Sequence, residues 1–215
     1  MTALTPELLL SAYRVGVFPM AGPDGEVGWY APDPRAVLPL DRFHVPKTLA
    51  KTVRQRRFGV AVDRDFEGTM RACAAPAPGR EETWISEELI AAYVALHRAG
   101  FAHSVECWRD GAFAGGLYGV ALGGAFFGES MVSRVRDASK VALVALVGRL
   151  RAGGFQLLDT QMTTPHLARF GVAEIPRAAF ERRLADALAA EGDWHALDRH
   201  QSDAAGVTPS PPDAP

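Results

Sequence analysis

The sequence is poor in cysteine, in long apolar runs and in net charge. Cys73 and Cys107 are the only cysteines among 215 residues, too few for a disulfide framework or a cysteine metal cluster. No apolar run approaches the roughly 20 residues that a membrane-spanning helix needs. The formal net charge of −2 argues against general binding to polyanions, although it permits a local basic patch.

Common catalytic and export motifs are missing too. No serine lies in a G-x-S-x-G context, and the six histidines include no pair with the H-x-x-x-H spacing of a zinc site. We therefore expect neither a serine nucleophile nor a metal. The first residues, MTALTPELLL, lack the basic region and the small-residue cleavage site of a signal peptide. The expected location is the reducing cytoplasm.

Composition divides the chain into a small N-terminal domain, a larger catalytic domain and a disordered tail, predicted over residues 1–60, 61–199 and 200–215. Near the start, Thr5 is the predicted N-cap of a helix over residues 6–14. A segment dense in proline and glycine follows over residues 16–40 and contains Trp29 and Tyr30. It is predicted to be a structured loop whose aromatic side chains either pack on the body or contact a ligand.

A second predicted helix, over residues 46–57, carries five positive charges and no acid. Lys47, Lys51 and Arg54 follow i, i+4, i+7 spacing and therefore share one face. A basic face of this kind is usually only solvated, and the alternative is contact with phosphate groups.

The larger domain has an order of predicted elements that is typical of one architecture. A helix capped by Ser86 precedes three antiparallel strands, which turn at Asp110-Gly111 and Gly123-Gly124. A strand, a helix and a second strand follow over residues 123–161, and another helix over 178–190. This is the order of the acyl-CoA N-acyltransferase architecture. The predicted fold class is therefore α/β (α+β), with a mixed sheet and flanking helices.

The strand–helix–strand run from Gly123 to Gln161 carries the candidate site. Ser139 is the predicted N-cap of its helix, and a connection of this kind normally makes the two strands parallel. Ligands of open α/β sheets bind beyond the carboxyl ends of such strands. Glu129 lies at one of these ends and Asp159 with Gln161 at the other, so we expect all three to face one crevice.

Asp159 and Gln161 are two residues apart on a strand, so the alternation of side chains predicts that they point to the same side. A carboxylate that orients a glutamine amide can supply a proton acceptor or an oriented dipole to a reacting group. The alternative is a polar pair that only caps the strand into its loop.

The loop before the central helix lacks the feature that coenzyme A needs. Acyl-CoA users carry a Gly-rich loop whose backbone N–H groups hold the pyrophosphate at the N-terminus of a helix. Here the corresponding residues are SRVRDASK, without glycine. The sequence therefore argues against the binding of coenzyme A, and no cofactor is expected.

Several stretches together resemble the leucyl/phenylalanyl-tRNA–protein transferase family. They run in order over most of the chain and include AYRVGVFPM, WYAPDPRAVLPL, GESMVS, ASKVAL, LLDTQ and EIPR. The resemblance implies an aminoacyltransferase that uses Leu-tRNA or Phe-tRNA as donor. It implies transfer to the α-amino group of proteins that begin with arginine or lysine, which marks them for N-degron degradation. A monomer is the default, and neither DNA nor a membrane is an expected partner.

The same resemblance implies roles for particular residues. Asp159 and Gln161 match the catalytic pair, and Glu129 matches an acid of the same pocket that would attract the cationic acceptor. The apolar pocket for the donor side chain is matched by Leu117, Phe126, Leu143, Leu146 and Leu158. Tyr13, Trp84 and Tyr93 match aromatic residues around the terminal adenosine. The basic face of Lys47, Lys51 and Arg54 fits a site for the tRNA acceptor stem.

Two departures from the family leave alternatives open. Family members usually carry a further aromatic-rich N-terminal segment, and Met20 stands where tryptophan is common. One alternative is therefore a tRNA-binding or adaptor protein with impaired catalysis, and another is a CoA-dependent N-acetyltransferase. The sequence ranks neither leucine against phenylalanine nor the natural acceptor proteins.

Overall fold

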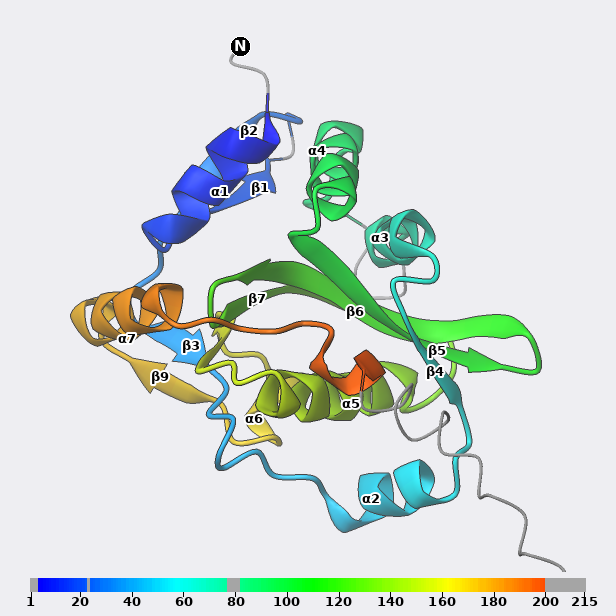
Figure 1. Ribbon diagram of the computed structural model, residues 1–215. Coiled ribbons are helices and arrows are strands. Elements are labelled where there is room, and N and C mark those ends of the chain that lie inside the picture. Colours follow the sequence, from blue (N-terminus) through cyan, green and yellow to red (C-terminus); the bar gives the residue numbers. More distant parts are fainter. Residues whose placement is uncertain (1–3, 23, 77–81, 200–215) are drawn as a thin grey trace, which may run out of the picture.

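The computed structural model describes residues 4–22, 24–76 and 82–199. A seven-stranded mixed sheet lies at its centre, and a separate two-stranded hairpin lies beside the first helix (Figure 1). The strands are β1 (Phe18–Ala21), β2 (Val27–Tyr30), β3 (Arg35–Val37), β4 (Gly59–Val62), β5 (Ala102–Arg109), β6 (Ala112–Leu122), β7 (Ala125–Ser133), β8 (Leu157–Gln161) and β9 (Ala173–Ile175). The helices are α1 (Pro6–Arg14), α2 (Lys47–Arg54), α3 (Phe66–Ala74), α4 (Glu87–Arg98), α5 (Ala138–Ala152), α6 (Pro165–Ala168) and α7 (Arg177–Ala189).

The strand order of the sheet is β4-β5-β6-β7-β8-β3-β9. Neighbouring strands are antiparallel except β7 and β8, which are parallel and are joined by the crossover helix α5. Helices α3 and α4 lie over one face of the sheet, and α5 lies over the other (Figure 1). This arrangement confirms the predicted mixed sheet with flanking helices, and it confirms the predicted parallel pair.

The N-caps predicted from the sequence are correct for two helices and wrong for a third. The side chains of Thr5 and Ser86 accept hydrogen bonds from backbone N–H groups in the first turns of α1 and α4, as predicted. The prediction that Ser139 caps α5 was wrong, because that helix begins at Ala138 and follows Asp137. The N–H of Ser139 donates instead to Ser133 Oγ at 2.9 Å. A hydroxyl at the end of β7 therefore satisfies the donor that a local cap would have taken.

Residues 16–40 contain three strands, so the prediction of a loop was wrong for those residues. β1 and β2 form the antiparallel hairpin, and β3 lies in the main sheet between β8 and β9. Strands of three or four residues among prolines and glycines leave no alternation long enough to recognise. β3 joins residues on both sides of the predicted domain boundary at residue 60 into one sheet, and that boundary stays a prediction. The predicted disordered tail lies outside the described residues.

Apolar side chains pack against both faces of the sheet. One cluster joins the sheet to α1, α3, α4 and α7, and it contains Tyr13, Tyr93 and Phe180. The other lies beneath α5 and α2 and contains Leu49, Leu146 and other apolar residues. Among the described residues, no helix is long and apolar enough to cross a membrane.

Candidate active site

The sheet splits between its two parallel strands, and a cavity lies in the split. β7 and β8 pair only as far as Phe127 and Asp159, after which β7 continues beside β6. The cavity has a volume of about 740 Å³ and is lined by residues of both strands, of α5 and of the segment around α6. Two of the three residues predicted to face one crevice do so, because Glu129 and Gln161 line the cavity. Asp159 lies behind the cavity wall and has no exposed surface.

Glu129 reaches the split because of a bulge in β7. Gly128 pairs with Gly119 and Ser130 pairs with Tyr118, which leaves Glu129 as an additional residue in β7. A bulge of this kind changes the direction of a side chain, and bulges are common beside active sites. Here it brings the carboxylate against α1 and α4, the helices that carry Tyr13 and Tyr93.

Three donors surround the carboxylate of Glu129. The Tyr13 hydroxyl donates to Oε1 at 2.7 Å, Gln161 Nε2 donates to Oε1 at 2.9 Å, and the Tyr93 hydroxyl donates to Oε2 at 3.3 Å. The two tyrosine hydroxyls also lie within hydrogen-bonding distance of each other, so their two protons are shared among this contact and the two contacts with Glu129. Burial is the strongest influence and raises the pKa of Glu129 to about 7, with a smaller contribution in the same direction from Asp159, while the three donors oppose the rise. Glu129 can therefore change its protonation state near neutral pH.

Asp159 is held by Arg35 and by the backbone of Gln161. Arg35 Nε donates to Oδ1 at 2.9 Å and Arg35 Nη2 to Oδ2 at 2.6 Å, and the Gln161 N–H donates to Oδ1 at 2.9 Å. Burial raises the pKa of the Asp159 carboxyl, and these donors oppose the rise. Both oxygens accept hydrogen bonds from a guanidinium, which is the arrangement of an ionised carboxylate.

The predicted contact between the side chains of Asp159 and Gln161 does not form. Gln161 has a left-handed backbone, with φ of 63°, and this breaks the alternation expected of an extended strand. Its amide donates to Glu129, and only its backbone N–H reaches Asp159. Asp159 therefore holds the peptide of Gln161, while Glu129 holds its side chain.

Four of the five residues predicted for the donor pocket line the apolar part of the cavity, namely Leu117, Leu143, Leu146 and Leu158. The fifth, Phe126, is fully buried outside the lining and stacks on Trp194 with ring centroids 5.4 Å apart. Met131 contributes a further apolar wall that sequence reasoning missed. Its place in β7 directly after Glu129 and Ser130 was the available signal.

The three aromatic residues predicted to contact adenosine lie in two different environments. Trp84 lines the cavity and so does Met20, at the end that faces the β1–β2 hairpin. Tyr13 and Tyr93 have no exposed surface, and their hydroxyls point at Glu129. In this structure those two rings support the carboxylate and offer no open face for stacking.

The cavity wall also contains charged groups and polar atoms that lack partners. Arg136, Asp137 and Lys140 lie around the start of α5, where Lys140 Nζ is 2.7 Å from Asp137 Oδ1. The hydroxyls of Tyr118 and Thr160 and His166 Nε2 are buried in lining residues without a hydrogen-bond partner. Buried polar atoms normally have partners, so each of these three atoms leaves a donor or an acceptor unused in the wall of the cavity.

The backbone groups that would cradle a pyrophosphate are already engaged. The N–H of Ala138 donates to Val135 O, and the N–H of Ser139 donates to Ser133 Oγ. Asp137, immediately before α5, adds a negative charge at the position that a pyrophosphate would take. The residues present at this helix end therefore do not fit coenzyme A.

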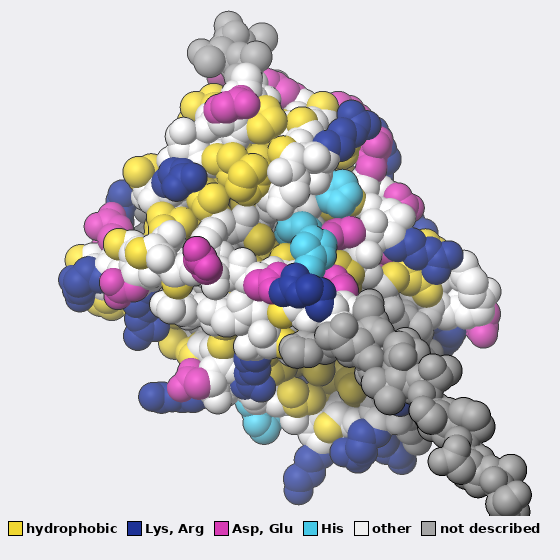
Figure 2. Space-filling view, in the orientation of Figure 1, with side chains coloured by type: hydrophobic (Ala, Val, Ile, Leu, Met, Phe, Trp, Pro, Cys, Tyr) yellow, Lys and Arg dark blue, Asp and Glu magenta, His cyan; other side chains and the backbone are white. Residues whose placement is uncertain are grey.

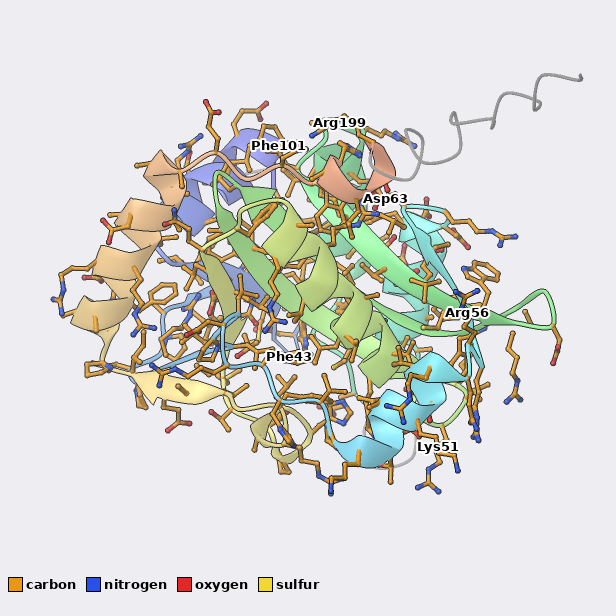
Figure 3. The ribbon with its side chains drawn as sticks, turned by 60° about the horizontal axis from the view of Figure 1, so that its bottom comes forward. Phe43, Lys51, Arg56, Asp63, Phe101 and Arg199 are labelled. Atoms are coloured by element: carbon orange, nitrogen blue, oxygen red, sulfur yellow. The ribbon has the colours of Figure 1, made fainter. Side chains whose placement is uncertain are left out.

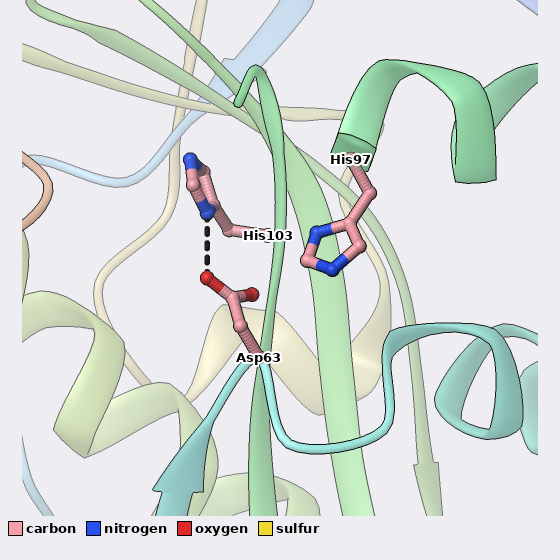
Figure 4. A group of neighbouring side chains, drawn as sticks. All are labelled: Asp63, His97 and His103. Carbon is pink, nitrogen blue, oxygen red and sulfur yellow. Dashed lines mark hydrogen bonds and ion pairs between the residues drawn. The ribbon is translucent and has the colours of Figure 1, made fainter. Parts of the chain in front are cut away.

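Asp63, His97 and His103 form a polar cluster elsewhere, beside β4 and β5 (Figure 4). One ligand atom of each lies within 4.8 Å of the others. Asp63 Oδ2 is 2.7 Å from His103 Nδ1 and 3.3 Å from Trp194 Nε1, and Oδ1 accepts the N–H of Ser104 at 2.7 Å. A cation would have to displace these bonds. The cluster is best described as a hydrogen-bonded link between β4, β5 and the segment after α7.

The predicted basic helix is α2, and its charged face is solvent-exposed. Lys47, Lys51 and Arg54 are all exposed, while Leu49 on the opposite side is buried beneath α5. Lys51 points away from the sheet (Figure 3), and Lys and Arg side chains gather on the surface over α2 (Figure 2). Figure 1 places this face on the α5 side of the sheet.

The apolar part of the cavity, here called the chamber, is lined by Leu117, Met131, Leu143, Leu146 and Leu158, and the titratable carboxylate of Glu129 lies at the cavity wall. Together with an N-acyltransferase-like fold whose parallel strands splay apart at the cavity, this site indicates an acyltransferase. The family model described as leucyl/phenylalanyl-tRNA protein transferase matches residues 37–185, and the model of that family's N-terminal domain matches residues 2–33. The chain belongs to the leucyl/phenylalanyl-tRNA–protein transferase family. It is an aminoacyltransferase.

Relatives of the same name are similar over most of their length. The leucyl/phenylalanyl-tRNA–protein transferase of Rubrobacter xylanophilus is 62% identical over 86% of this chain and 95% of its own. That of Salinibacter ruber is 58% identical over 90% of this chain and 84% of its own. Among solved structures, L-PGS from Bacillus licheniformis has a TM-score of 0.43 and 12% identity over 71% of this chain and 56% of its own, a likeness that carries no argument.

Arg35 is the main residue of the site that sequence reasoning missed. It lies in the quoted stretch WYAPDPRAVLPL, as the one charged residue directly before an apolar run. That isolated charge was a signal, but its partner lies 124 residues later in the chain.

Proposed function

We propose that this enzyme moves leucine or phenylalanine from its tRNA onto the N-terminal α-amino group of a protein that begins with arginine or lysine. The observation that carries the proposal is one cavity that joins an apolar chamber to the carboxylate of Glu129. The donor needs the chamber for its side chain, and the attacking amine needs an acceptor for its proton. Membership of the family supports tRNA as carrier and protein as acceptor.

The chamber suits a donor side chain that branches no earlier than Cγ. Its walls are leucines and a methionine, with no charged group among them. Leucine and phenylalanine can extend between these walls, whereas the Cβ methyl of isoleucine or valine would collide at the entrance. Such a difference is worth about 1–3 kcal/mol per methylene-sized group, or roughly 10- to 200-fold in kcat/KM.

The reaction forms an amide C–N bond and breaks the ester C–O bond between the amino acid and the terminal ribose. The amine loses a proton, and the ribose oxygen gains one as it leaves. Glu129 accepts the proton of the amine in its carboxylate form, and its negative charge attracts the cationic acceptor. Gln161, with its amide bonded to Glu129, orients the incoming amine. Asp159 acts through Gln161, because its oxygens are occupied by Arg35 and the backbone.

The donor tRNA would lie along the α5 side of the molecule. Trp84 and Met20, which line one end of the cavity, would contact the terminal adenosine, and the exposed face of α2 would contact phosphates of the acceptor stem. Phosphate contacts are largely independent of sequence, which suits an enzyme that reads the attached amino acid. Because aminoacyl-tRNA is the donor, the proposed reaction belongs in the cytoplasm, where it would mark proteins for N-degron degradation.

The proposal is tested by transfer of labelled leucine from Leu-tRNA to a peptide that begins with arginine. The matched controls are the same peptide with an acetylated N-terminus, a peptide that begins with alanine, and Ile-tRNA as donor. We expect label only in the arginine peptide with the free amine. Binding of Leu-tRNA without transfer would instead support an adaptor with impaired catalysis. Acetylation of the peptide by acetyl-CoA would support the N-acetyltransferase alternative.

A further inference from the structure

Arg35 is a buried cation in the wall behind the candidate active site. Only 1% of its surface is exposed, and Asp159 beside it has none. Its Nε and Nη2 form the two parallel hydrogen bonds to Asp159, and its Nη1 donates to the carbonyl oxygen of Gly16 at 3.0 Å. Phe18 and Phe180 cover its guanidinium, with ring centroids 4.8 and 4.5 Å from Cζ. The guanidinium therefore has one well-defined position.

Contacts lead without interruption from Arg35 to the cavity. Arg35 holds both oxygens of Asp159, and Asp159 Oδ1 accepts the backbone N–H of Gln161. Gln161 needs that bond because its left-handed φ of 63° is unfavourable for a residue with a side chain, by about 1–2 kcal/mol. With its backbone held in this conformation, the Gln161 amide reaches Glu129 Oε1 at 2.9 Å.

An ion pair this deeply buried is not explained by stability alone, because its desolvation costs free energy. Desolvating both charges costs several kcal/mol per ion, and apolar side chains of similar volume often stabilise a protein as well or better. The bidentate geometry, however, fixes the direction of the carboxylate in a way that a single cation such as lysine cannot. An apolar pair at the same place would not fix the orientation of Asp159, whereas this ion pair does.

We propose that Arg35 is a positioning residue for aminoacyl transfer, which acts through Asp159 to hold the Gln161 amide against Glu129. This inference rests on the proposed function. Arg35 contacts neither the cavity nor a reacting atom. Its effect belongs to the bond-forming step, because none of the described residues that its side chain contacts lines the cavity, and its connection to the cavity ends at Gln161 and Glu129.

The test compares Arg35→Lys with a matched control in the same chain, Arg149→Lys. Arg149 is also buried, binds both oxygens of Asp198, donates to the carbonyl oxygen of Trp194 and lies over an aromatic ring. It does not line the cavity. We expect Arg35→Lys to lower kcat for leucine transfer by about 100-fold, the cost of a misplacement of roughly 1 Å, with KM for Leu-tRNA little changed. Arg149→Lys should leave kcat unchanged.

A readout that does not depend on activity is the side-chain NH₂ resonance of Gln161 in ¹⁵N-labelled protein, assigned by its loss in Gln161→Met. Arg35→Lys should shift or broaden this resonance, and Arg149→Lys should not. If the wild-type enzyme transfers no leucine, the proposed function fails, while the resonance still tests whether Arg35 acts through Asp159 on Gln161. If wild type is active and Arg35→Lys keeps its kcat and its Gln161 resonance, the positioning role is overturned.

Should Arg35→Lys fail to fold, the double variant Arg35→Met with Asp159→Leu replaces the ion pair by apolar groups and removes the unpaired charge. We expect it to fold and to lose kcat to the same extent, since Gln161 has lost its anchor. A folded double variant with the kcat of wild type would overturn the proposal.

Discussion

Glu129 occupies the additional position of a bulge in β7, where Tyr13, Tyr93 and Gln161 surround its carboxylate. Burial raises its pKa from 4.5 to about 7. The folded protein therefore keeps a proton on Glu129 at pH values where the unfolded chain has lost it. Stability falls as the pH rises between these two values, so ionised Glu129 lowers stability in the pH range where it can act as a base.

At the scale of this single residue, Glu129→Gln is expected to abolish leucine transfer and to raise the melting temperature at pH 8. The amide keeps an oxygen that accepts from Tyr13 and Gln161, but it cannot take up the proton of the amine. The gain is at most on the order of 3 kcal/mol, since one pKa unit corresponds to about 1.4 kcal/mol. Calorimetry at pH 8 and at pH 4 checks it, because the gain should vanish at pH 4. Transfer at the wild-type rate would exclude Glu129 as the proton acceptor.

A substitution at Leu143 tests whether the chamber binds the donor side chain. Leu143→Phe adds volume to the wall of the cavity, so the larger donor side chain should suffer more than the smaller one. We expect kcat/KM for Phe-tRNA to fall about tenfold further than that for Leu-tRNA, which corresponds to about 1.4 kcal/mol. Competition between the two donors measures the ratio directly. Leu143→Met, which conserves volume, is the control and should leave the ratio near that of wild type.

At the scale of elements, β3 decides the composition of the site. This strand of three residues pairs with β8 on one side and β9 on the other, and its first residue is Arg35. A shift of one residue in its register would turn Arg35 to the other face of the sheet and leave the buried carboxylate of Asp159 without its cation. The short strand is therefore held in register by the ion pair that it carries.

The helix α2 makes a second prediction at this scale. Changing Lys47, Lys51 and Arg54 together to Glu should raise KM for Leu-tRNA and flatten its dependence on salt, because fewer counterions are released when phosphates bind. kcat should change little, since α2 does not line the cavity.

Initial rates at several salt concentrations check this. The control with the same change in net charge is a triple substitution to Glu on the exposed face of α7, at Arg177, Arg182 and Arg183. Equal effects of the two triple variants would mean that only overall charge matters and that the α2 face is merely solvated.

At the scale of the whole molecule, the segment after α7 packs against β5 and β7. Trp194 lies between His103 and Phe126, with ring centroids 4.3 Å and 5.4 Å away. Asp63 joins this segment to β5, because it is hydrogen-bonded to both His103 and Trp194. Burial is the largest influence on Asp63 and would raise its pKa. The hydrogen bonds from His103 and Ser104 and the electrostatic influence of His103 and His97 together outweigh burial, so the pKa is lowered.

A lowered pKa means that Asp63 stabilises the folded state above pH 3.8, its ordinary pKa, and that this contribution is lost as the pH falls through the folded value. Asp63→Asn should therefore reduce the free energy of unfolding by about 1–3 kcal/mol at pH 7, as expected for a hydrogen bond to a charged group. The difference from wild type should shrink toward pH 3. Urea unfolding at both pH values measures it. Asp110→Asn, at an exposed turn, is the control and should change neither value.

Local signals in the sequence were enough for much of this protein. Thr5 and Ser86 mark the starts of two helices, and the apolar spacing between Gly123 and Gln161 identifies a strand–helix–strand unit with parallel strands. From that unit follows the meeting of Glu129 and Gln161 at one cavity, because the ends of parallel strands lie at the same edge. These features depend on neighbours a few residues apart, so spacing alone determines them.

The tertiary structure decided which groups touch. The insertion of β3 beside β8, the bond from Arg35 to Asp159 and the burial of Tyr13 and Tyr93 against Glu129 all join residues far apart in the chain. The bulge at Glu129 and the left-handed backbone of Gln161 arise from the same packing. Residue spacing cannot show such contacts, because a strand of three residues or an isolated arginine acquires its partner only when the sheet assembles. The sequence by itself determined where the carboxylates would gather, and the packed sheet decided that Asp159 holds the backbone of Gln161 while Glu129 faces the cavity.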